Sequence, residues 1–218
     1  MKKRYIIIAI VLVAMFMSIS AAATNTNPLL EIGAYFRDFQ NSKNLLIDDG
    51  KENLAAEYHE SKITKAELEF RKRIQGLLDG ESSEKLSDHQ VIDVIVKGIM
   101  QVEEAERLGI SATQAEIDSM MQEQKRNYEI PEVKEYLDDH CKGAEITIEE
   151  YFSYLEQHAP IYISRQKLQN KIGEQFCAEN GLEFTNINPP QEMLDAIDAY
   201  IEELFEAHKG EIVYYIDN

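Results

Sequence analysis

The chain has 218 residues, 44% of them hydrophobic and 28% charged, which is the composition of a folding globular protein. Its 40 acidic and 22 basic residues give a formal net charge of −18 at pH 7, which repels the phosphate backbone of nucleic acids. It has only 10 glycines and 5 prolines. We therefore expect a mainly α-helical protein without a nucleic-acid partner.

The first 23 residues follow the three-part plan of a secretory signal peptide. Residues 2–4 are basic, residues 6–17 are apolar without a break, and small residues follow through Ala23. We predict cleavage before Thr24, with an uncleaved N-terminal anchor as the alternative. The apolar run is short beside the roughly 20 residues of a membrane span. In both cases we expect an exported protein that touches the membrane only through this segment.

Residues 24–52 are expected to form a tether and a juxtamembrane helix. Residues 24–28 are polar, and residues 29–46 carry apolar side chains at roughly helical spacing. The acidic turn at residues 48–51 ends this helix. Residues 53–218 then form the main domain.

Four predicted helix starts share one pattern, a hydroxyl residue followed three positions later by Glu or Gln. The hydroxyl accepts a hydrogen bond from the third backbone N–H of the helix, and the Glu or Gln side chain reaches back to the cap. Helices are therefore expected to begin after Thr64, Ser87, Thr113 and Thr147. Pro160 is expected to separate two helices, 148–158 and 161–178, and residues 191–208 form the last helix.

Two short segments have the composition of strands. Residues 54–58 precede the first helix of the main domain, and residues 211–216 are rich in β-branched and aromatic side chains. Because they lie at the two ends of the domain, we predict a small β element that pairs the N-terminal and C-terminal segments.

Four sequence blocks within residues 53–216 resemble the chaperone domain of the SurA and PrsA type, which is related to the substrate-binding domain of trigger factor. The blocks are residues 56–68 (AEYHESKITKAEL), residues 92–118 with EAERLGI, residues 146–151 (ITIEEY), and residues 200–215, which begin with YIEEL. The resemblance implies a SurA N-terminal-like helical fold. It also implies an ATP-independent chaperone, or holdase, for unfolded or newly translocated polypeptides.

Members of this family often carry a parvulin prolyl isomerase domain before the last helix. The corresponding link here, residues 186–191, is far too short for a domain of roughly 90 residues. The resemblance therefore implies holding without isomerase activity. Two alternatives stay open: a dedicated scaffold or assembly partner at the cell surface, and a family member that is called a peptidyl-prolyl isomerase but lacks the catalytic domain.

The sequence has no pattern of catalysis or metal binding. It lacks the nucleotide-binding, serine-hydrolase and zinc-protease motifs. The histidines are scattered, whereas a zinc site needs several ligands close together. We therefore expect neither an enzyme nor a metal or cofactor. The five histidines are His59, His89, His140, His158 and His208.

Methionine and tyrosine side chains are the candidates for a substrate-binding surface. Thioethers repack around varied partners, and tyrosine combines apolar area with a polar tip. Ordinary core packing is the alternative for each of them. The predicted substrate-binding residues are Met100, Met120, Met121, Tyr128, Tyr151, Tyr154 and Tyr162.

Cys141 and Cys177 are the only cysteines of the chain. Outside the cytoplasm two cysteines can oxidise, so a disulfide between them is one interpretation. Two free buried thiols are the other. The sequence leaves both open, because the distance between the two residues decides.

Overall fold

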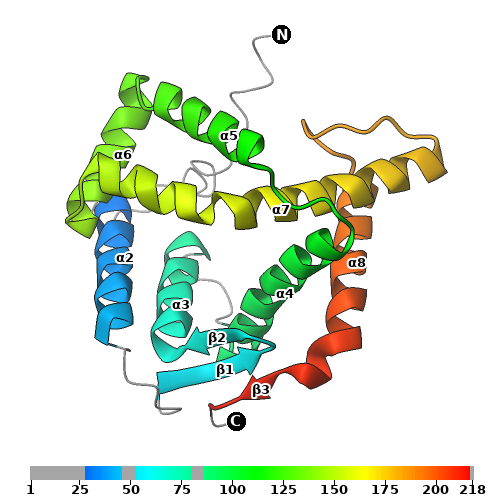
Figure 1. Cartoon of the computed structure of the whole chain (residues 1–218), viewed down its shortest axis with the longest axis horizontal. Helices are drawn as coiled ribbons and strands as arrows, with labels where there is room; N and C mark the ends of the chain where they lie inside the picture. The colour runs from blue at the N-terminus through cyan, green and yellow to red at the C-terminus, as the bar shows by residue number, and fades with distance from the viewer. Residues whose placement is uncertain (1–27, 46–52, 80–85, 217–218) are drawn as a thin grey trace.

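The computed structural model describes residues 28–45, 53–79 and 86–216. In these ranges the chain is mainly helical, as the sequence predicts, with one small antiparallel sheet (Figure 1). The predicted signal or anchor segment, residues 1–23, lies outside the described residues, as does the acidic turn at residues 48–51. No described helix is both long and apolar enough to cross a membrane. The helices are α2 (Pro28–Leu45), α3 (Lys65–Asp79), α4 (Asp88–Arg107), α5 (Gln114–Asn127), α6 (Pro131–Ala144), α7 (Ile148–Asn180) and α8 (Gln191–His208), followed by the short 3-10 helix η2 (Lys209–Glu211).

The capping pattern marks the helix starts correctly. Complete capping boxes open α4 at Ser87, α5 at Thr113 and α7 at Thr147. At the start of α3, the Thr64 hydroxyl accepts a hydrogen bond of 3.1 Å from the backbone N–H of Glu67. Each hydroxyl satisfies a donor that the first helical turn leaves without a partner.

Helix α7 differs from the prediction, because it continues through Pro160 as one helix of 33 residues. Proline removes a backbone hydrogen bond and costs a helix interior about 3 kcal/mol. The surrounding helices offset this cost, since α7 packs against α4, α5, α6 and α8, and the cluster with α5 includes α7 residues on both sides of Pro160. Ala159 and Leu168 on α7 are fully buried by these contacts. Packing against other helices therefore outweighs the local cost of proline in a helix, from which the break is predicted.

The sheet joins the two ends of the domain, as predicted. Strand β1 (Leu54–Tyr58) lies between β2 (Ser61–Thr64) and β3 (Val213–Tyr214), and both pairings are antiparallel. Ala56 stands opposite Tyr214. The C-terminal strand is shorter than residues 211–216, because η2 occupies the chain up to Glu211.

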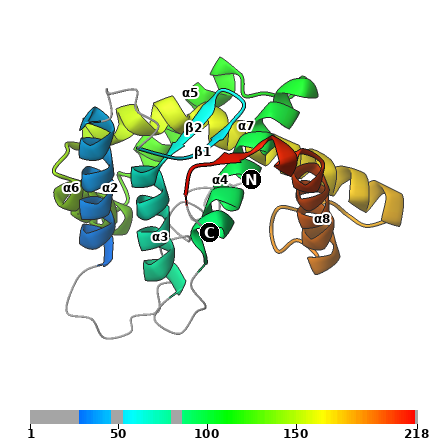
Figure 2. The same cartoon turned by 90° about the horizontal axis from the view of Figure 1, so that it is seen from below.

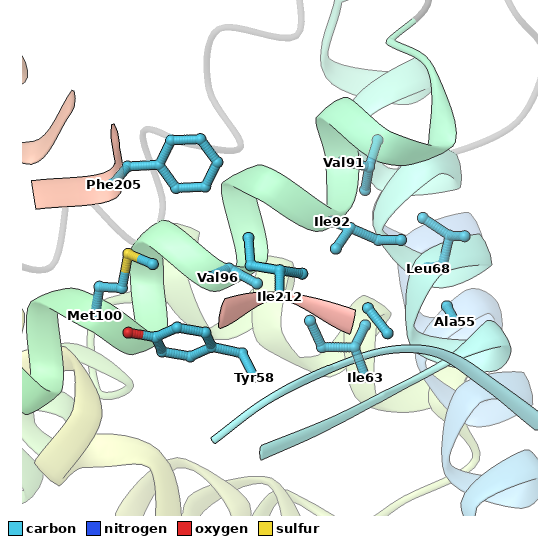
Figure 3. Close-up of a cluster of buried hydrophobic side chains, with 11 residues drawn as sticks. Ala55, Tyr58, Ile63, Leu68, Val91, Ile92, Val96, Met100, Phe205 and Ile212 are labelled. Carbon is cyan, nitrogen blue, oxygen red and sulfur yellow. The ribbon is translucent and has the colours of Figure 1, made fainter. Parts of the chain in front are cut away.

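The main core lies between this sheet and helices α3, α4 and α8 (Figure 3). Strand β1 contributes Tyr58, α4 contributes Ile92 and Val96, and α8 contributes Phe205. Ile212, which follows η2, also packs there. The core therefore binds the first and last parts of the domain to each other.

Helix α7 connects the two ends of the molecule. Figures 1 and 2 show α2 and α6 side by side near one end of α7 and α8 near the other. A cluster of Ile117, Met120 and Met121 from α5 packs on Ala159. A separate cluster of Met193 and Ile197 from α8 packs on Cys177.

Helix α2, which the sequence predicts at residues 29–46, crosses α6 at two glycines. A Cβ atom on Gly33 would lie 2.2 Å from the His140 carbonyl oxygen, and one on Gly143 would lie 2.1 Å from the Leu30 carbonyl oxygen. Only glycine allows the two backbones to approach so closely. These contacts join the predicted juxtamembrane helix to α6, which lies within the main domain predicted at residues 53–218.

Alanine at either crossing glycine is expected to destabilise the protein. In Gly33→Ala and Gly143→Ala, the new methyl group meets backbone atoms, which cannot move aside as a side chain can. We expect each change to lower the free energy of unfolding by about 1–3 kcal/mol, the usual cost of overpacking. Urea unfolding measures this effect, and limited proteolysis at α2 tests whether the helix detaches.

Gly76→Ala is the matched control for both variants. Gly76 lies in α3, and a Cβ atom there would meet no atom within 4 Å. This change should raise the free energy of unfolding by about 0.5 kcal/mol, because glycine disfavours helix. Wild-type stability in Gly33→Ala would contradict the glycine crossing.

Candidate functional site

One face of α7 is turned toward α3 and α4, and we call it the α7 inner face. It consists of Tyr154, His158, Ile161, Arg165 and Gln169, whose spacing of three or four residues places them in a row on the helix. The other side of the helix, which includes Ala159, packs on α5. The row is continuous only because α7 does not break at Pro160.

The two ends of the inner face rest on neighbouring helices. The Tyr154 ring packs edge-on against Phe36 of α2, with 4.7 Å between ring centroids, and stacks on His158 at 4.0 Å. At the other end, the Gln169 amide donates a hydrogen bond of 2.8 Å to Gln101 of α4. The inner face therefore extends from α2 to α4. Figure 1 agrees with this, because α7 passes above α3 and α4 in that view.

Ile161 lies in the middle of this row and is 47% exposed. A half-exposed isoleucine between an aromatic ring and polar side chains offers apolar contact area with hydrogen-bonding groups beside it. This combination suits the binding of a polypeptide, which presents both apolar side chains and backbone amides. It provides no group for acid–base or nucleophilic chemistry at Ile161 itself.

Arg165 gives the inner face a positive charge. Burial lowers the pKa of its guanidinium, and the charge of Arg71 on α3 lowers it further. A Cβ atom on Gly98 of α4 would lie 3.4 Å from the Arg165 Nη1 atom, so the guanidinium lies directly against α4. The inner face of this strongly acidic chain thus carries an arginine that is affected by the charge of a second arginine on α3.

The three methionines predicted to bind substrate are core residues. Met100 is 2% exposed in the main core, while Met120 and Met121 are buried between α5 and α7. They do not form a surface in this structure. Their placement matches core packing, the alternative that the sequence left open, because the apolar side of α5 faces α7.

The four tyrosines are half-buried and lie in different places. Tyr128 ends α5 and donates a hydrogen bond of 2.6 Å from its hydroxyl to Asp138 of α6. Tyr151 packs edge-on against His140 of α6, and Tyr162 packs on the α5 cluster. Only Tyr154 belongs to the inner face. Ile161, Arg165 and Gln169 are not among the residues predicted from the sequence, because the break expected at Pro160 interrupts their row.

Both cysteines are free, buried thiols. Cys141 lies on α6, whereas Cys177 packs with Met193 and Ile197 near the far end of α7. The disulfide considered from the sequence is therefore not formed, and the second interpretation describes the structure. Burial raises the pKa of the Cys141 thiol to about 11, so it is a poor nucleophile near neutral pH.

A cluster of histidines and carboxylates lies at the turn between β1 and β2. The His59 ring contacts Glu103 of α4 through Nδ1 at 3.1 Å and Glu211 of η2 through Nε2 at 2.6 Å. His208 also contacts Glu211, at 2.9 Å. Among the residues that the structure describes, no group of three or more such side chains is placed to hold a metal ion. The cluster is an ionic tie between the sheet, α4 and η2.

No family model, no curated protein and no solved structure matches this chain. The resemblance to the SurA and PrsA type therefore rests on its sequence blocks and stays a prediction. The mainly helical fold with a three-stranded antiparallel sheet stands independently of it.

The ionic tie predicts a stability that falls as the pH rises. Contacts with Glu211 and Glu103 raise the pKa of His59 in the folded chain. The stabilising contribution is therefore complete below the ordinary histidine pKa of about 6.5 and is lost as the pH rises through the higher folded value. Urea unfolding should show a larger difference between wild type and His59→Gln at about pH 6 than at about pH 8.5.

His89→Gln is the control for this measurement, because His89 packs against the Tyr214 ring, with 4.7 Å between centroids. It shows how much stability is lost when an imidazole outside the ionic tie is removed. An equal difference between wild type and His59→Gln at both pH values would contradict the ionic tie.

Proposed function

We propose that this protein is an exported, ATP-independent chaperone that holds unfolded or newly translocated polypeptides against the α7 inner face. The observation that carries the proposal is the half-exposed Ile161, in a row with Tyr154 and Gln169 on a helix that spans the molecule. The sequence blocks similar to the SurA and PrsA type, together with the signal-like N-terminus, support the same function and an exported location.

Binding of this kind needs little specificity. Apolar side chains of the client contact Ile161 and the Tyr154 ring, which is the general driving force of association in water. Amide and guanidinium groups in the same row bind the polar parts of the client. No nucleotide takes part, and the client leaves when its own folding buries the segments that were held.

The surface charge fits a protein that works among unfolded chains. A net charge of −18 makes copies of the protein repel one another, while basic stretches of a client are attracted. Isomerase activity is not part of the proposal. Residues 181–190 alone connect α7 to α8, so the place of the parvulin domain holds only a short connection.

A dedicated scaffold or assembly partner is the second candidate function. The connection between α7 and α8 and the start of α8 favour it, because exposed apolar side chains gather there in sequence. They are Leu182 at 42%, Ile187 at 43% and Leu194 at 37% exposure. One partner with a complementary apolar surface would cover them.

An aggregation assay separates these functions. The full-length chain, at stoichiometric amounts and without nucleotide, should suppress light scattering by several unrelated unfolded proteins. In Ile161→Ser, removing the apolar side chain costs on the order of 1 kcal/mol of contact, so about fivefold more protein should be needed for the same suppression.

Ile130→Ser is the matched control, since Ile130 is 44% exposed at the start of α6, away from the inner face, and serine is a favourable residue at a helix start. It should suppress aggregation as the wild type does. Failure of the wild-type chain to suppress aggregation of any client would contradict the holdase. Capture of a single tight partner that is lost in Ile187→Ser would support the scaffold function instead.

A further inference from the structure

The charge of Arg165 is not compensated within the described part of the chain. Its Nε atom is shielded from solvent and has no hydrogen-bond partner there, and no ion pair to its guanidinium is found among the same residues. A guanidinium is a rigid fork of donors that is costly to bury when no acceptor faces it. The protein therefore keeps one buried guanidinium donor on the α7 inner face, the Arg165 Nε–H, without an acceptor among the described residues.

Four other arginines, Arg37, Arg71, Arg73 and Arg107, have carboxylate partners, whereas no partner is found among the described residues for the exposed Arg126. Arg107 holds both oxygens of Glu104, at 2.6 Å each. Arg37 pairs with Glu145, and Arg73 lies 3.6 Å from Asp38. Because acidic residues outnumber basic ones almost two to one, a half-buried arginine without an acid is unusual here. The missing partner is an acceptor that the described residues do not supply.

The surroundings of Arg165 favour a carboxylate as that acceptor. The charge of Arg71 on α3 acts on the Arg165 guanidinium, and Arg71 itself lies 4.0 Å from the Glu67 carboxylate. Ile161 lies one helical turn before Arg165 and Gln169 one turn after it, so apolar and amide contacts flank the charge. A carboxylate accepts two parallel hydrogen bonds from a guanidinium, which a neutral amide cannot do as strongly.

We propose that Arg165 binds a carboxylate of the held polypeptide, either the C-terminal carboxylate or an Asp or Glu side chain. This inference rests on the proposed function, because the carboxylate belongs to the client on the inner face. The charged pair anchors one point of the client, and the flanking side chains contact the residues next to it. The net charge of −18 repels carboxylates from the protein surface as a whole. A preference for carboxylate peptides must therefore come from the positive charge at Arg165.

Fluorescence anisotropy with matched peptides tests this inference on the full-length chain. One labelled apolar peptide is prepared with a free C-terminal carboxylate, with a C-terminal amide, and as the amide with an internal Gln replaced by Glu. The free carboxylate should bind about tenfold tighter than the amide, which corresponds to about 1.4 kcal/mol. The Glu-containing amide identifies the source: tight binding shows that side-chain carboxylates are accepted, and binding as weak as the plain amide shows that the C-terminus is required.

Two variants assign the effect to the arginine. In Arg165→Gln the carboxylate and the amide peptide should bind equally, at about the affinity of the amide for the wild type. Arg126→Gln changes the net charge by the same amount at an exposed position of α5, and it should keep the tenfold preference. Arg165→Lys keeps the positive charge but lacks the planar guanidinium that donates two parallel hydrogen bonds. It should therefore retain only part of the preference for the carboxylate peptide.

The outcomes separate the two proposals. If all three peptides bind the wild type equally, the carboxylate site is wrong while the holdase stands. If none binds, the proposed function fails and the carboxylate site fails with it. Urea unfolding of Arg165→Gln is a further check: stability equal to or above wild type agrees with an arginine that lacks an internal partner. A clear loss of stability, together with equal peptide binding, would show that the chain itself supplies the acid and would overturn the inference.

Discussion

The continuity of α7 through Pro160 is the constraint on which the rest of the structure depends. In the part of the chain that the structure describes, α7 packs against α4, α5, α6 and α8. Proline weakens it at one turn, and the full burial of Ala159 and Leu168 on either side offsets that loss. A break there would divide the inner face in two, and it would disrupt the cluster with α5, which includes α7 residues on both sides of Pro160.

The other sides of α7 have structural tasks, which leaves the inner face for binding. One side packs on the methionines of α5. Another fixes the connection between α4 and α5: the Ser164 hydroxyl accepts a hydrogen bond of 2.9 Å from the Ala112 N–H, and Lys167 donates to the Ser111 carbonyl at 3.0 Å. The main core, in contrast, lies at the sheet and closes the ends of the domain. Stability and the proposed binding therefore depend on largely different residues, and substitutions at Ile161 or Arg165 can test function without removing the core.

The sequence predicts those features that depend on neighbouring residues in the chain. Capping at Ser87, Thr113 and Thr147 is local chemistry, and the helix starts follow from it. The pairing of β1 with β3 also follows, because only two strand-like segments lie at the domain ends. The break at Pro160 is wrong for the opposite reason, since contacts between helices decide it. Periodicity on α5 likewise predicts an apolar side of the helix, but it does not show that α7 covers this side. Met120 and Met121 are therefore predicted for a binding surface although they are buried.

Features that depend on two distant elements had no signal in the sequence. Gly33 and Gly143 are ordinary helix glycines until α2 and α6 cross at them. Arg165 is one of 22 basic residues, and only its surroundings show that its donors lack an acceptor among the described residues. The candidate site was therefore predicted only at Tyr154, and its other members came from the structure.

A distance between two spin labels on α7 tests the central claim most directly. Ser153 and Glu174 are exposed and lie on opposite sides of Pro160 in the sequence. Each is changed to cysteine and labelled in a chain with Cys141→Ala and Cys177→Ala, and the distance is measured by pulsed electron paramagnetic resonance. A continuous helix places these two backbone positions about 32 Å apart, at about 1.5 Å per residue, and predicts one narrow distribution near that value. A distribution that is broad or centred well below it would show that α7 breaks at Pro160, and the continuous inner face would be contradicted.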